Sequence, residues 1–338
     1  MRKALRTWAV VAALPCLAGG LWADAGTSEV DAQLMASRRV FSRIGPGLRA
    51  VRHASNGNYY VLASPNVGVV IFDPNGKQLS VIGASPEPPA ANKAGRAPMA
   101  FGEDCDVDAQ GNVYVADRGY NLVTVFSPDG KQLRSFPVDS LSSLAALPDG
   151  EVAVTTTHQS HLVTVYGPNG RVVREFGAPE SLSTRADLDL YLNLGRINSD
   201  PQGHIYYGFT YMPEPLVRQY DRFGNASLEY EFTGVDAYSE AQAARKAIER
   251  EETRSSPISL HPILTAFGVD PVNGDVWMGL HNTLIHFDKD GIRRSEYQIY
   301  TPKGTRLEAT VILVEEQRLL IGADPLGVYE FPRPDRKQ

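Results

Sequence analysis

The chain has 338 residues, of which 43% are hydrophobic, and its formal net charge at pH 7 is −6. This composition excludes a disordered or collagen-like chain, and the negative charge disfavours nucleic acid and anionic lipid as main partners. The length fits either two domains or one large β architecture.

Residues 1–25 have the three parts of an export signal: the basic "MRKALR", the apolar "TWAVVAALPCLAGGLW" and small residues at Ala23 and Ala25 for cleavage. A membrane anchor is the alternative, but the apolar run is short and Pro15 and two glycines interrupt it. Lipid attachment at Cys16 is a further alternative, which a proline directly before the cysteine disfavours. No later run is long and apolar enough to span a bilayer. We therefore expect a periplasmic or extracellular protein.

Export would leave the chain with a single cysteine. Removing the first 25 residues takes away three basic residues and one aspartate, so the formal net charge falls from −6 to −8. Cys105 then has no partner in the chain, and no disulfide framework supports the fold. Because Cys105 precedes an apolar strand, we expect a buried, unreactive thiol there.

A repeated unit determines the predicted architecture. From residue 106, "DVDAQGNVYVADRGYNLVTVFSPDGKQLRSF" predicts four short strands with glycine-containing turns after the first and third. Related copies occupy residues 51–83, 144–177, 198–232, 267–300 and 307–331. Five of the six copies have an aromatic residue before the second turn and a glycine in it: Phe72, Phe126, Tyr166, Tyr220 and Phe287, with Gly76, Gly130, Gly170, Gly224 and Gly291. Repeats of this length predict a propeller, a solenoid or an array.

The incomplete last copy favours a closed ring. The copy at 307–331 ends without a fourth strand, whereas "SRRVFSRIG" (37–45) looks like a fourth strand placed ahead of the first copy. In a ring this N-terminal strand completes the last blade and leaves no long sheet edge open. We therefore predict an all-β, six-bladed β-propeller over residues 37–332, between a linker (26–36) and a C-terminal tail (333–338).

The copy that begins at residue 106 resembles an NHL repeat, the unit of six-bladed propellers found in many exported bacterial proteins. The resemblance covers most of residues 37–332; it is strong in the second copy, fair in the first and third, and weaker in the last three. "YMPEPLVRQYDRFG" and "EEQRLLIGADPLG" depart from the pattern. The resemblance implies a binding platform in most cases and a metal-dependent lyase or lactonase in a minority, so the fold alone does not define a function.

The two faces of such a disc differ in their loops. Turns after the first and third strands of each copy are short, and we assign them no function. The opposite face, the long-loop face, carries three long insertions, at residues 84–104, 178–196 and 233–266. The last is predicted to be a helical insertion (about 236–256) with its helix over 239–252, in which Ser239 caps the helix and Gln242 completes a capping box. Long loops extend a surface for binding.

Aromatic, cationic and polar side chains on the long-loop face are the candidate ligand-binding residues. Tyr and Arg offer a large contact area with a polar end. For each residue the alternative is packing of the loop against its blade, and for Asp117 it is bracing of its own loop. The candidates are Phe101, Asp117, Arg118, Tyr120, His158, Arg185, Arg196, Tyr211 and His281.

Four histidines on the same face are the candidate ligands of a metal ion: His158, His161, His261 and His281. They come from different blades, and no H-x-x-x-H or cysteine pair fixes a local ligand geometry. We therefore expect no defined cofactor, and a divalent metal ion is the alternative. His53 and His286 fall within predicted strands, and we expect structural roles for both.

These features support three functional hypotheses. The leading one is a non-catalytic propeller, expected to be monomeric, that binds a protein, peptide or glycan through its long-loop face. The alternative is a metal-dependent hydrolase or lyase with its site at the mouth of the central channel. The third is a scaffold component of an envelope assembly. No nucleophile-elbow or phosphate-binding glycine motif is present, and the catalytic residues are unknown.

Overall fold

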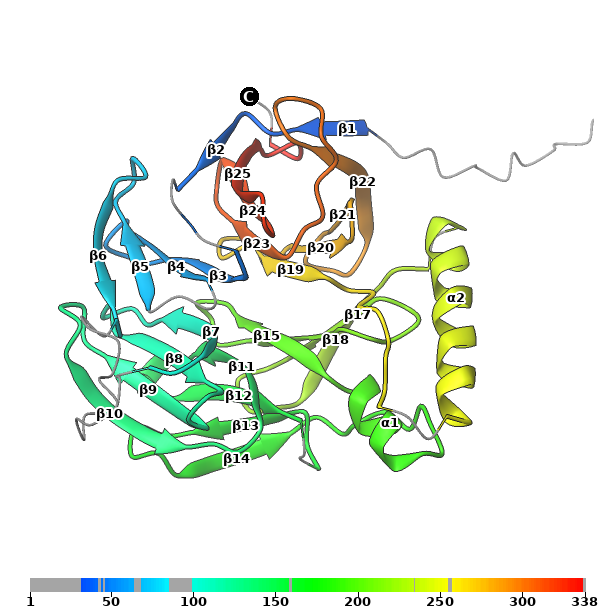
Figure 1. Ribbon diagram of the computed structural model, residues 1–338, viewed down its shortest axis with the longest axis horizontal. Coiled ribbons are helices and arrows are strands. Elements are labelled where there is room, and N and C mark those ends of the chain that lie inside the picture. Colours follow the sequence, from blue (N-terminus) through cyan, green and yellow to red (C-terminus); the bar gives the residue numbers. More distant parts are fainter. Residues whose placement is uncertain are drawn as a thin grey trace, which may run out of the picture.

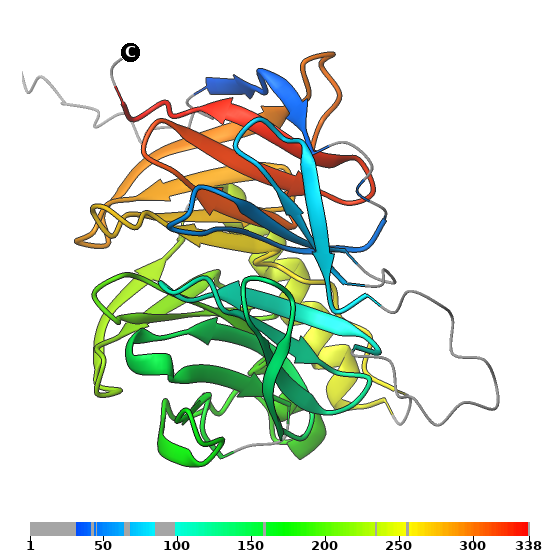
Figure 2. The same cartoon turned by 90° about the vertical axis from the view of Figure 1, so that its left-hand side faces the viewer.

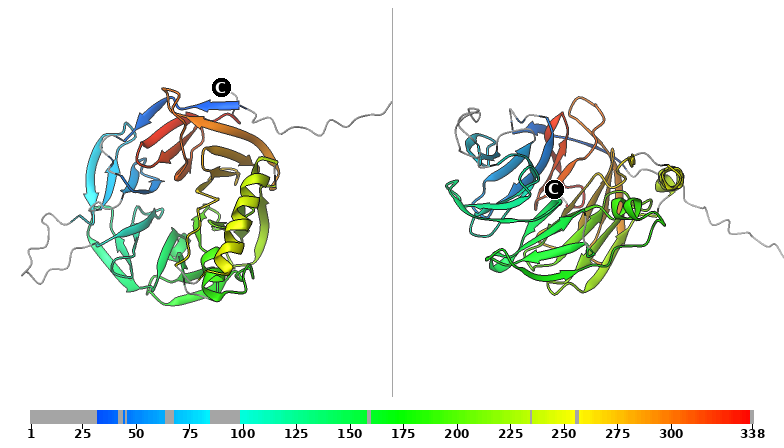
Figure 3. Two further views of the ribbon diagram at one scale, coloured as in Figure 1. Left: turned by 45° about the vertical axis from the view of Figure 1, so that its right-hand side comes forward. Right: turned by 60° about the horizontal axis from the view of Figure 1, so that its bottom comes forward.

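The computed structural model describes residues 32–41, 44, 46–63, 68–84, 99–157, 160–233, 235–254 and 257–336. The predicted signal segment and His158 lie outside the described residues. Six sheets, antiparallel apart from one added parallel strand, stand around a central channel and form a six-bladed β-propeller (Figure 1; Figure 3). The predicted fold class is therefore confirmed.

Each of the first four blades consists of four consecutive strands. Blade 1 contains β3 (Leu48–His53), β4 (Tyr59–Ala63), β5 (Val69–Phe72) and β6 (Gln78–Ile82). Blade 2 contains β7 (Gly102–Val107), β8 (Val113–Asp117), β9 (Leu122–Phe126) and β10 (Gln132–Pro137). Blade 3 contains β11 (Leu141–Ala146), β12 (Val152–Thr156), β13 (Val163–Tyr166) and β14 (Val172–Phe176), with the 3-10 turn η1 (Pro148–Gly150). Blade 4 contains β15 (Gly195–Ser199), β16 (Ile205–Phe209), β17 (Leu216–Tyr220) and β18 (Ala226–Glu231).

The N-terminal strands complete the last two blades. Blade 5 contains β19 (Ala266–Val269), β20 (Val276–Leu280), β21 (Thr283–Phe287) and β22 (Arg293–Tyr300), and β1 (Ala32–Met35) pairs in parallel with β22. Blade 6 contains β23 (Val311–Val314), β24 (Arg318–Ala323) and β25 (Gly327–Pro332), and its outer strand is β2 (Arg38–Val40), antiparallel to β25. Figure 2 shows the blue N-terminal strands beside the red β25. Closure by an N-terminal strand is confirmed, whereas the parallel β1 was not predicted.

Packing between neighbouring blades forms the core. Among the described residues, six hydrophobic clusters occur, and each joins two adjacent blades. The aromatic residues of the repeat are all buried in them. Gly224 illustrates the turn requirement: its φ is +93°, and a Cβ atom there would lie 2.5 Å from the Phe176 ring of the neighbouring blade. The repeat pattern thus encodes both the turns and the contacts between blades.

Two helices lie in the long connections. α2 (Val235–Glu252) lies in the connection between blades 4 and 5 and covers part of one face of the disc (Figure 3, left). It begins before Ser239, so the predicted N-cap at Ser239 is wrong, because that residue lies inside the helix. α1 (Ala186–Leu192) occupies a segment that we expected to be loop, and it buries Leu188 and Leu192 on one face. Within the described part of the chain, no helix is long and apolar enough to cross a membrane.

Candidate functional site

A cavity of about 1140 Å³ opens at one end of the central channel. The first strand of each blade lines the channel, and the cavity lies where these strands end and the short turns begin. We call it the short-turn cavity. Its charged and titratable lining residues include Arg52, His53, Asp106, Asp108, Asp149, Asp200, Glu315, Glu316 and Arg318. It lies on the face of the short turns, where we did not expect a function.

The wall of the short-turn cavity holds a hydrogen-bonded cluster, the Glu315 cluster, where blades 6 and 1 meet. Glu315 follows β23 and accepts hydrogen bonds from His53 Nδ1 (2.7 Å), Tyr59 OH (2.7 Å) and Arg318 Nε (2.5 Å). Arg318 Nη2 also donates to Tyr59 OH at 2.6 Å. The His53 and Tyr59 rings stack with centroids 4.4 Å apart. These four residues therefore hold one another in fixed positions.

These contacts determine the charge of Glu315. Burial by itself would raise the pKa of this carboxyl group, but the hydrogen bonds from His53, Tyr59 and Arg318 outweigh burial and hold the pKa at about 2. Burial and the adjacent Glu315 carboxylate raise the pKa of Tyr59 to about 12. At neutral pH the cluster thus combines an ionised carboxylate with a neutral phenol.

His53 lines the cavity and uses one ring nitrogen in the Glu315 cluster. Its Nδ1 is bound by Glu315, its side chain is 36% exposed, and no described residue hydrogen-bonds to Nε2. A histidine held at one ring nitrogen by a carboxylate, with the other nitrogen open, has the arrangement of a general acid or base. We expected a structural role for His53, and its partner Glu315 lies more than 250 residues along the chain.

The short-turn cavity is predominantly acidic. Its lining contains two arginines, Arg52 and Arg318, against six carboxylates. Two of the carboxylates, Asp108 and Asp200, accept backbone hydrogen bonds within their own turns. Asp149 and Glu316 are exposed and have no ion-pair partner among the described residues. This charge distribution favours a ligand that carries positive charge.

Deeper in the channel, charged residues from several blades meet. Arg52 pairs with Asp104 (3.1 Å) and Asp106 (3.2 Å). Burial raises the pKa of Asp106, although Arg52 opposes this effect. Next to Arg52, towards the long-loop face, Arg196 Nη1 donates to the Arg49 carbonyl at 3.3 Å across the channel. The channel therefore narrows at a layer of arginines below the acidic cavity.

Several of the candidate ligand-binding residues lie at the opposite mouth of the channel, on the long-loop face. Phe101 packs under the Arg49 guanidinium, 5.7 Å from ring centroid to carbon, and Arg118 lies 3.9 Å from Glu103, which also pairs with Arg49. Tyr211 packs on Tyr191 with ring centroids 4.6 Å apart.

Other candidates have structural contacts. Buried Asp117 accepts backbone hydrogen bonds from Ala100 (2.7 Å), Phe101 (3.0 Å) and Tyr120 (3.1 Å), which is the loop-bracing role named as its alternative. Arg185 Nη1 donates to the carbonyls of Glu251 and Arg254, both at 2.6 Å, and so ties α1 to the end of α2.

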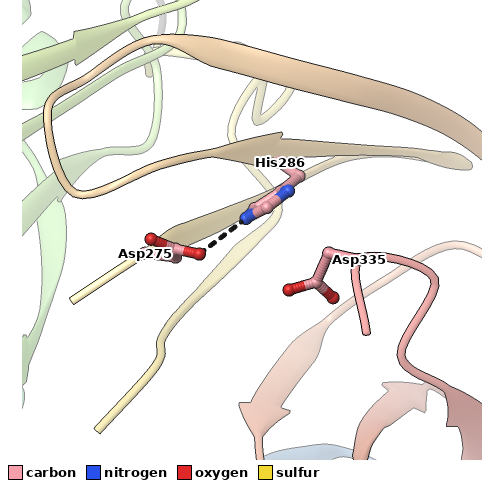
Figure 4. Close-up of side chains that lie close together, drawn as sticks. All are labelled: Asp275, His286 and Asp335. Atoms are coloured by element: carbon pink, nitrogen blue, oxygen red, sulfur yellow. Dashed lines mark hydrogen bonds and ion pairs between the residues drawn. The ribbon is translucent and has the colours of Figure 1, made fainter. Parts of the chain in front are cut away.

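The candidate histidines are not part of any metal-binding group among the described residues. His161 hydrogen-bonds Ser160, His261 is exposed, and His281 adopts a φ of +54° in the turn between β20 and β21. Asp275, His286 and Asp335 are the described residues that offer three ligand atoms within 4.8 Å of one another (Figure 4).

The Asp275–His286–Asp335 group already has protein partners. His286 Nε2 lies 3.0 Å from Asp275, and the His286 ring stacks on Trp277 at 4.2 Å. The Asp335 carboxylate binds the buried Arg333 guanidinium with both oxygens, and that pairing outweighs burial in lowering the Asp335 pKa. A cationic guanidinium beside the group opposes the binding of a divalent ion. We therefore assign the Asp275–His286–Asp335 group to docking of the C-terminal tail. The structural role expected for His286 agrees with these contacts.

One signal in the sequence pointed to the Glu315 cluster. "EEQRLLIGADPLG" departs from the repeat; its first residue is Glu315, and Arg318 follows three residues later. Charged residues at the end of an inner strand, where other copies have a glycine turn, mark the channel mouth. The partners His53 and Tyr59 lie in blade 1, and the sequence alone gave no reason to join them to blade 6.

No family model matches the chain, and no curated protein matches it. The structure is similar to a virginiamycin B lyase from Staphylococcus aureus, with a TM-score of 0.52, 13% identity and coverage of 86% of this chain and 81% of that one. It is also similar to a gluconolactonase from Xanthomonas campestris (TM-score 0.53, 16% identity, 86% and 87% covered) and to the WD40 repeats of RRP9 (TM-score 0.54, 12% identity, 89% and 99% covered). At these identities the similarity establishes the propeller fold alone.

Proposed function

We propose that the chain is an exported, NHL-like propeller that binds a peptide segment with a positively charged side chain in its short-turn cavity. The observation that carries the proposal is the excess of carboxylates in a cavity of about 1140 Å³, with exposed Asp149 and Glu316 at its wall. Such a cavity attracts cations and excludes anions. The predicted export signal over residues 1–25 supports a periplasmic or extracellular location. The NHL-like repeat supports the assignment to the class of binding propellers.

Labelled oligopeptides test this proposal. Fluorescein-labelled tetralysine should bind the full chain, tetraglutamate should not, and the affinity for tetralysine should fall as salt is added. A D149N/E316Q variant should lose affinity about tenfold, because two exposed carboxylates are neutralised without removing a buried contact. Equal binding of both peptides, or tetralysine binding that is unchanged in this variant, would reject the short-turn cavity as the site.

The long-loop face provides the comparison. Phe101, Arg118, Arg196 and Tyr211 lie at the opposite mouth of the channel, and they are four of the residues that we predicted from the sequence to bind a protein, peptide or glycan. An R118Q/Y211A variant should leave tetralysine binding unchanged under the present proposal. If this variant alone impairs peptide capture, the ligand binds at the long-loop face instead.

A second candidate function is an acid–base hydrolase or lyase in the same cavity, favoured by the open Nε2 of His53. The similar structures include a lyase and a gluconolactonase, which adds a fold-level analogy only. δ-Gluconolactone and p-nitrophenyl acetate serve as probes, with metal content measured on the same sample. His204 is the control, because it pairs with Asp200 at 2.7 Å and does not line the cavity. Turnover that falls about a hundredfold or more in H53N and is unchanged in H204N would support this function. Equal rates in the chain and in H53N would exclude it for these substrates.

A further inference from the structure

The layer between the two mouths of the channel gathers three arginines, and they differ in how well their charges are paired. A small space of about 30 Å³ is lined by Arg49, Arg52, Arg196 and Asp104, together with Asn198, Phe267 and Thr310. Of these arginines, Arg52 is paired with Asp104 and also with Asp106, 3.1 and 3.2 Å away. Arg49 and Arg196 come from blades 1 and 4, which lie on opposite sides of the ring.

The Asp104 carboxylate is already engaged. Asp104 Oδ1 binds Arg52 and the backbone N–H of Cys105, and its Oδ2 accepts from Ser143 Oγ at 2.6 Å and from the backbone N–H of Leu144 at 3.3 Å. Asp104 is buried and has no free lone pair directed at Arg196. Asp104 and Asp106 together compensate the charge of Arg52.

The other two arginines lack adequate partners. Glu103 lies 3.5 Å from Arg49 Nη1 and is shared with Arg118. Arg49 Nε is buried and has no hydrogen-bond partner. Of the described carboxylates, none lies within 4.0 Å of the Arg196 guanidinium, whose hydrogen bond goes to a backbone carbonyl. Desolvated guanidinium groups require a hydrogen-bond acceptor or a counter-charge.

We propose that a single small monovalent anion of the halide class binds in this space, between Arg49 and Arg196. The space of about 30 Å³ is small, and it suits a compact monatomic anion such as chloride. The anion would join blade 1 to blade 4 across the axis and close the channel between the long-loop mouth and the short-turn cavity. This site is independent of the peptide ligand proposed above.

Thermal unfolding of the full chain in sodium chloride and in sodium methanesulfonate at equal ionic strength tests the site. Chloride should raise the unfolding midpoint saturably by about 2–4 °C, because an anion that binds only the folded chain stabilises it. R196Q should abolish the chloride dependence. R222Q, which removes an exposed arginine elsewhere on blade 4, should retain it. The same midpoint in both salts for the unmodified chain would overturn the proposal.

Two further measurements keep the test independent of folding of the variant. Binding should broaden the ³⁵Cl resonance of the chloride solution, and bromide should reverse the broadening by competition. Crystals grown in sodium bromide should show one anomalous peak between Arg49 and Arg196. A water molecule at that position with no anomalous signal would reject the anion.

Discussion

At the scale of single residues, the Glu315 cluster shows how a buried carboxylate stays ionised. Burial alone favours the neutral acid, but Glu315 accepts hydrogen bonds from three donors, one of which is the permanently charged Arg318. Each donor also contacts another member, since Arg318 bonds Tyr59 and Tyr59 stacks on His53. Removing the carboxylate therefore leaves several polar groups at the channel wall without their acceptor.

This arrangement predicts an acid-dependent stability contribution. The pKa of Glu315 is about 2 in the folded chain and ordinarily 4.5, so the ionised form is preferred by folding. The stabilisation is complete above pH 4.5, amounts to about 3 kcal/mol by linkage, and is lost as the pH falls towards 2. E315Q should lower the free energy of unfolding at pH 7 by about 2–3 kcal/mol and flatten its slope between pH 4.5 and 2. Urea titrations at several pH values measure both effects.

Glu316, the residue after Glu315, is the matched control for this prediction. Glu316 lines the same cavity but is exposed. E316Q should change the free energy of unfolding by less than about 0.5 kcal/mol and keep the acid slope of the unmodified chain. Identical acid slopes for E315Q and the unmodified chain would show that Glu315 does not titrate at the depressed pKa.

At the scale of elements, the C-terminal tail after β25 works as a second closure between blades 5 and 6. Arg333 is fully buried and pairs with Asp270, which is also fully buried, at 2.6 Å. Its guanidinium carbon lies 5.7 Å from the Trp277 ring centroid, and both oxygens of Asp335 bind it from within the tail. The tail thus inserts a cation between two acidic groups and an aromatic face.

Loss of the Arg333 guanidinium should destabilise the folded chain. Among the described residues, R333M leaves buried Asp270 with the more distant Arg336, at 3.3 Å, as its remaining ion-pair partner, beside a hydrogen bond from the Val272 backbone N–H. We expect a loss of about 3–5 kcal/mol in the free energy of unfolding, because an uncompensated buried charge remains. R333M/D270N should recover part of that loss, since it removes the charge as well. Chemical denaturation of the two variants gives the comparison.

Arg336 is the control for this pair. Its side chain is 37% exposed, and it contacts the same aspartate. R336M should cost less than about 1 kcal/mol. If R333M were no more destabilising than R336M, the buried pair would not contribute to holding the tail.

The elements differ in how well the sequence predicts them. Glycine turns and alternating strands are local signals, and they predicted the six blades and the strand that closes the ring. β1 was not predicted, because parallel pairing with β22 depends on a partner more than 250 residues away. α1 is only seven residues long, and its buried Leu188 and Leu192 form too short a pattern to distinguish a helix from a loop.

The candidate site was harder to predict, because its residues come from distant parts of the chain. Residues on long loops were chosen because loops carry function in general. Phe101, Arg118, Arg196 and Tyr211 do gather at one mouth of the channel, while Asp117 and Arg185 brace local structure. The Glu315 cluster forms from residues on two blades at opposite ends of the chain, so only closure of the ring brings them together.

At the scale of the whole molecule, closure of the ring depends on blade 6, whose outer strand comes from the N-terminus. β2 pairs with β25, and Phe41, which follows β2, packs on Tyr59 and Phe72 of blade 1 with ring centroids 5.1 and 4.9 Å away. The same segment therefore covers the edge of blade 6 and fills the interface with blade 1. β1, in contrast, adds a fifth strand to a blade that is already complete.

Two nested deletions separate these contributions. Deleting residues 32–35 removes β1 and should lower the unfolding midpoint by about 2–4 °C, because blade 5 keeps four strands. Deleting residues 32–41 also removes β2 and Phe41, exposes the hydrogen-bonding edge of β25 and opens the blade 6–blade 1 interface, so we expect a loss of more than about 10 °C and self-association through the free edge. Scanning calorimetry with light scattering measures both. Equal midpoints for the two deletions would mean that the ring closes through the contacts between blades without its N-terminal strand.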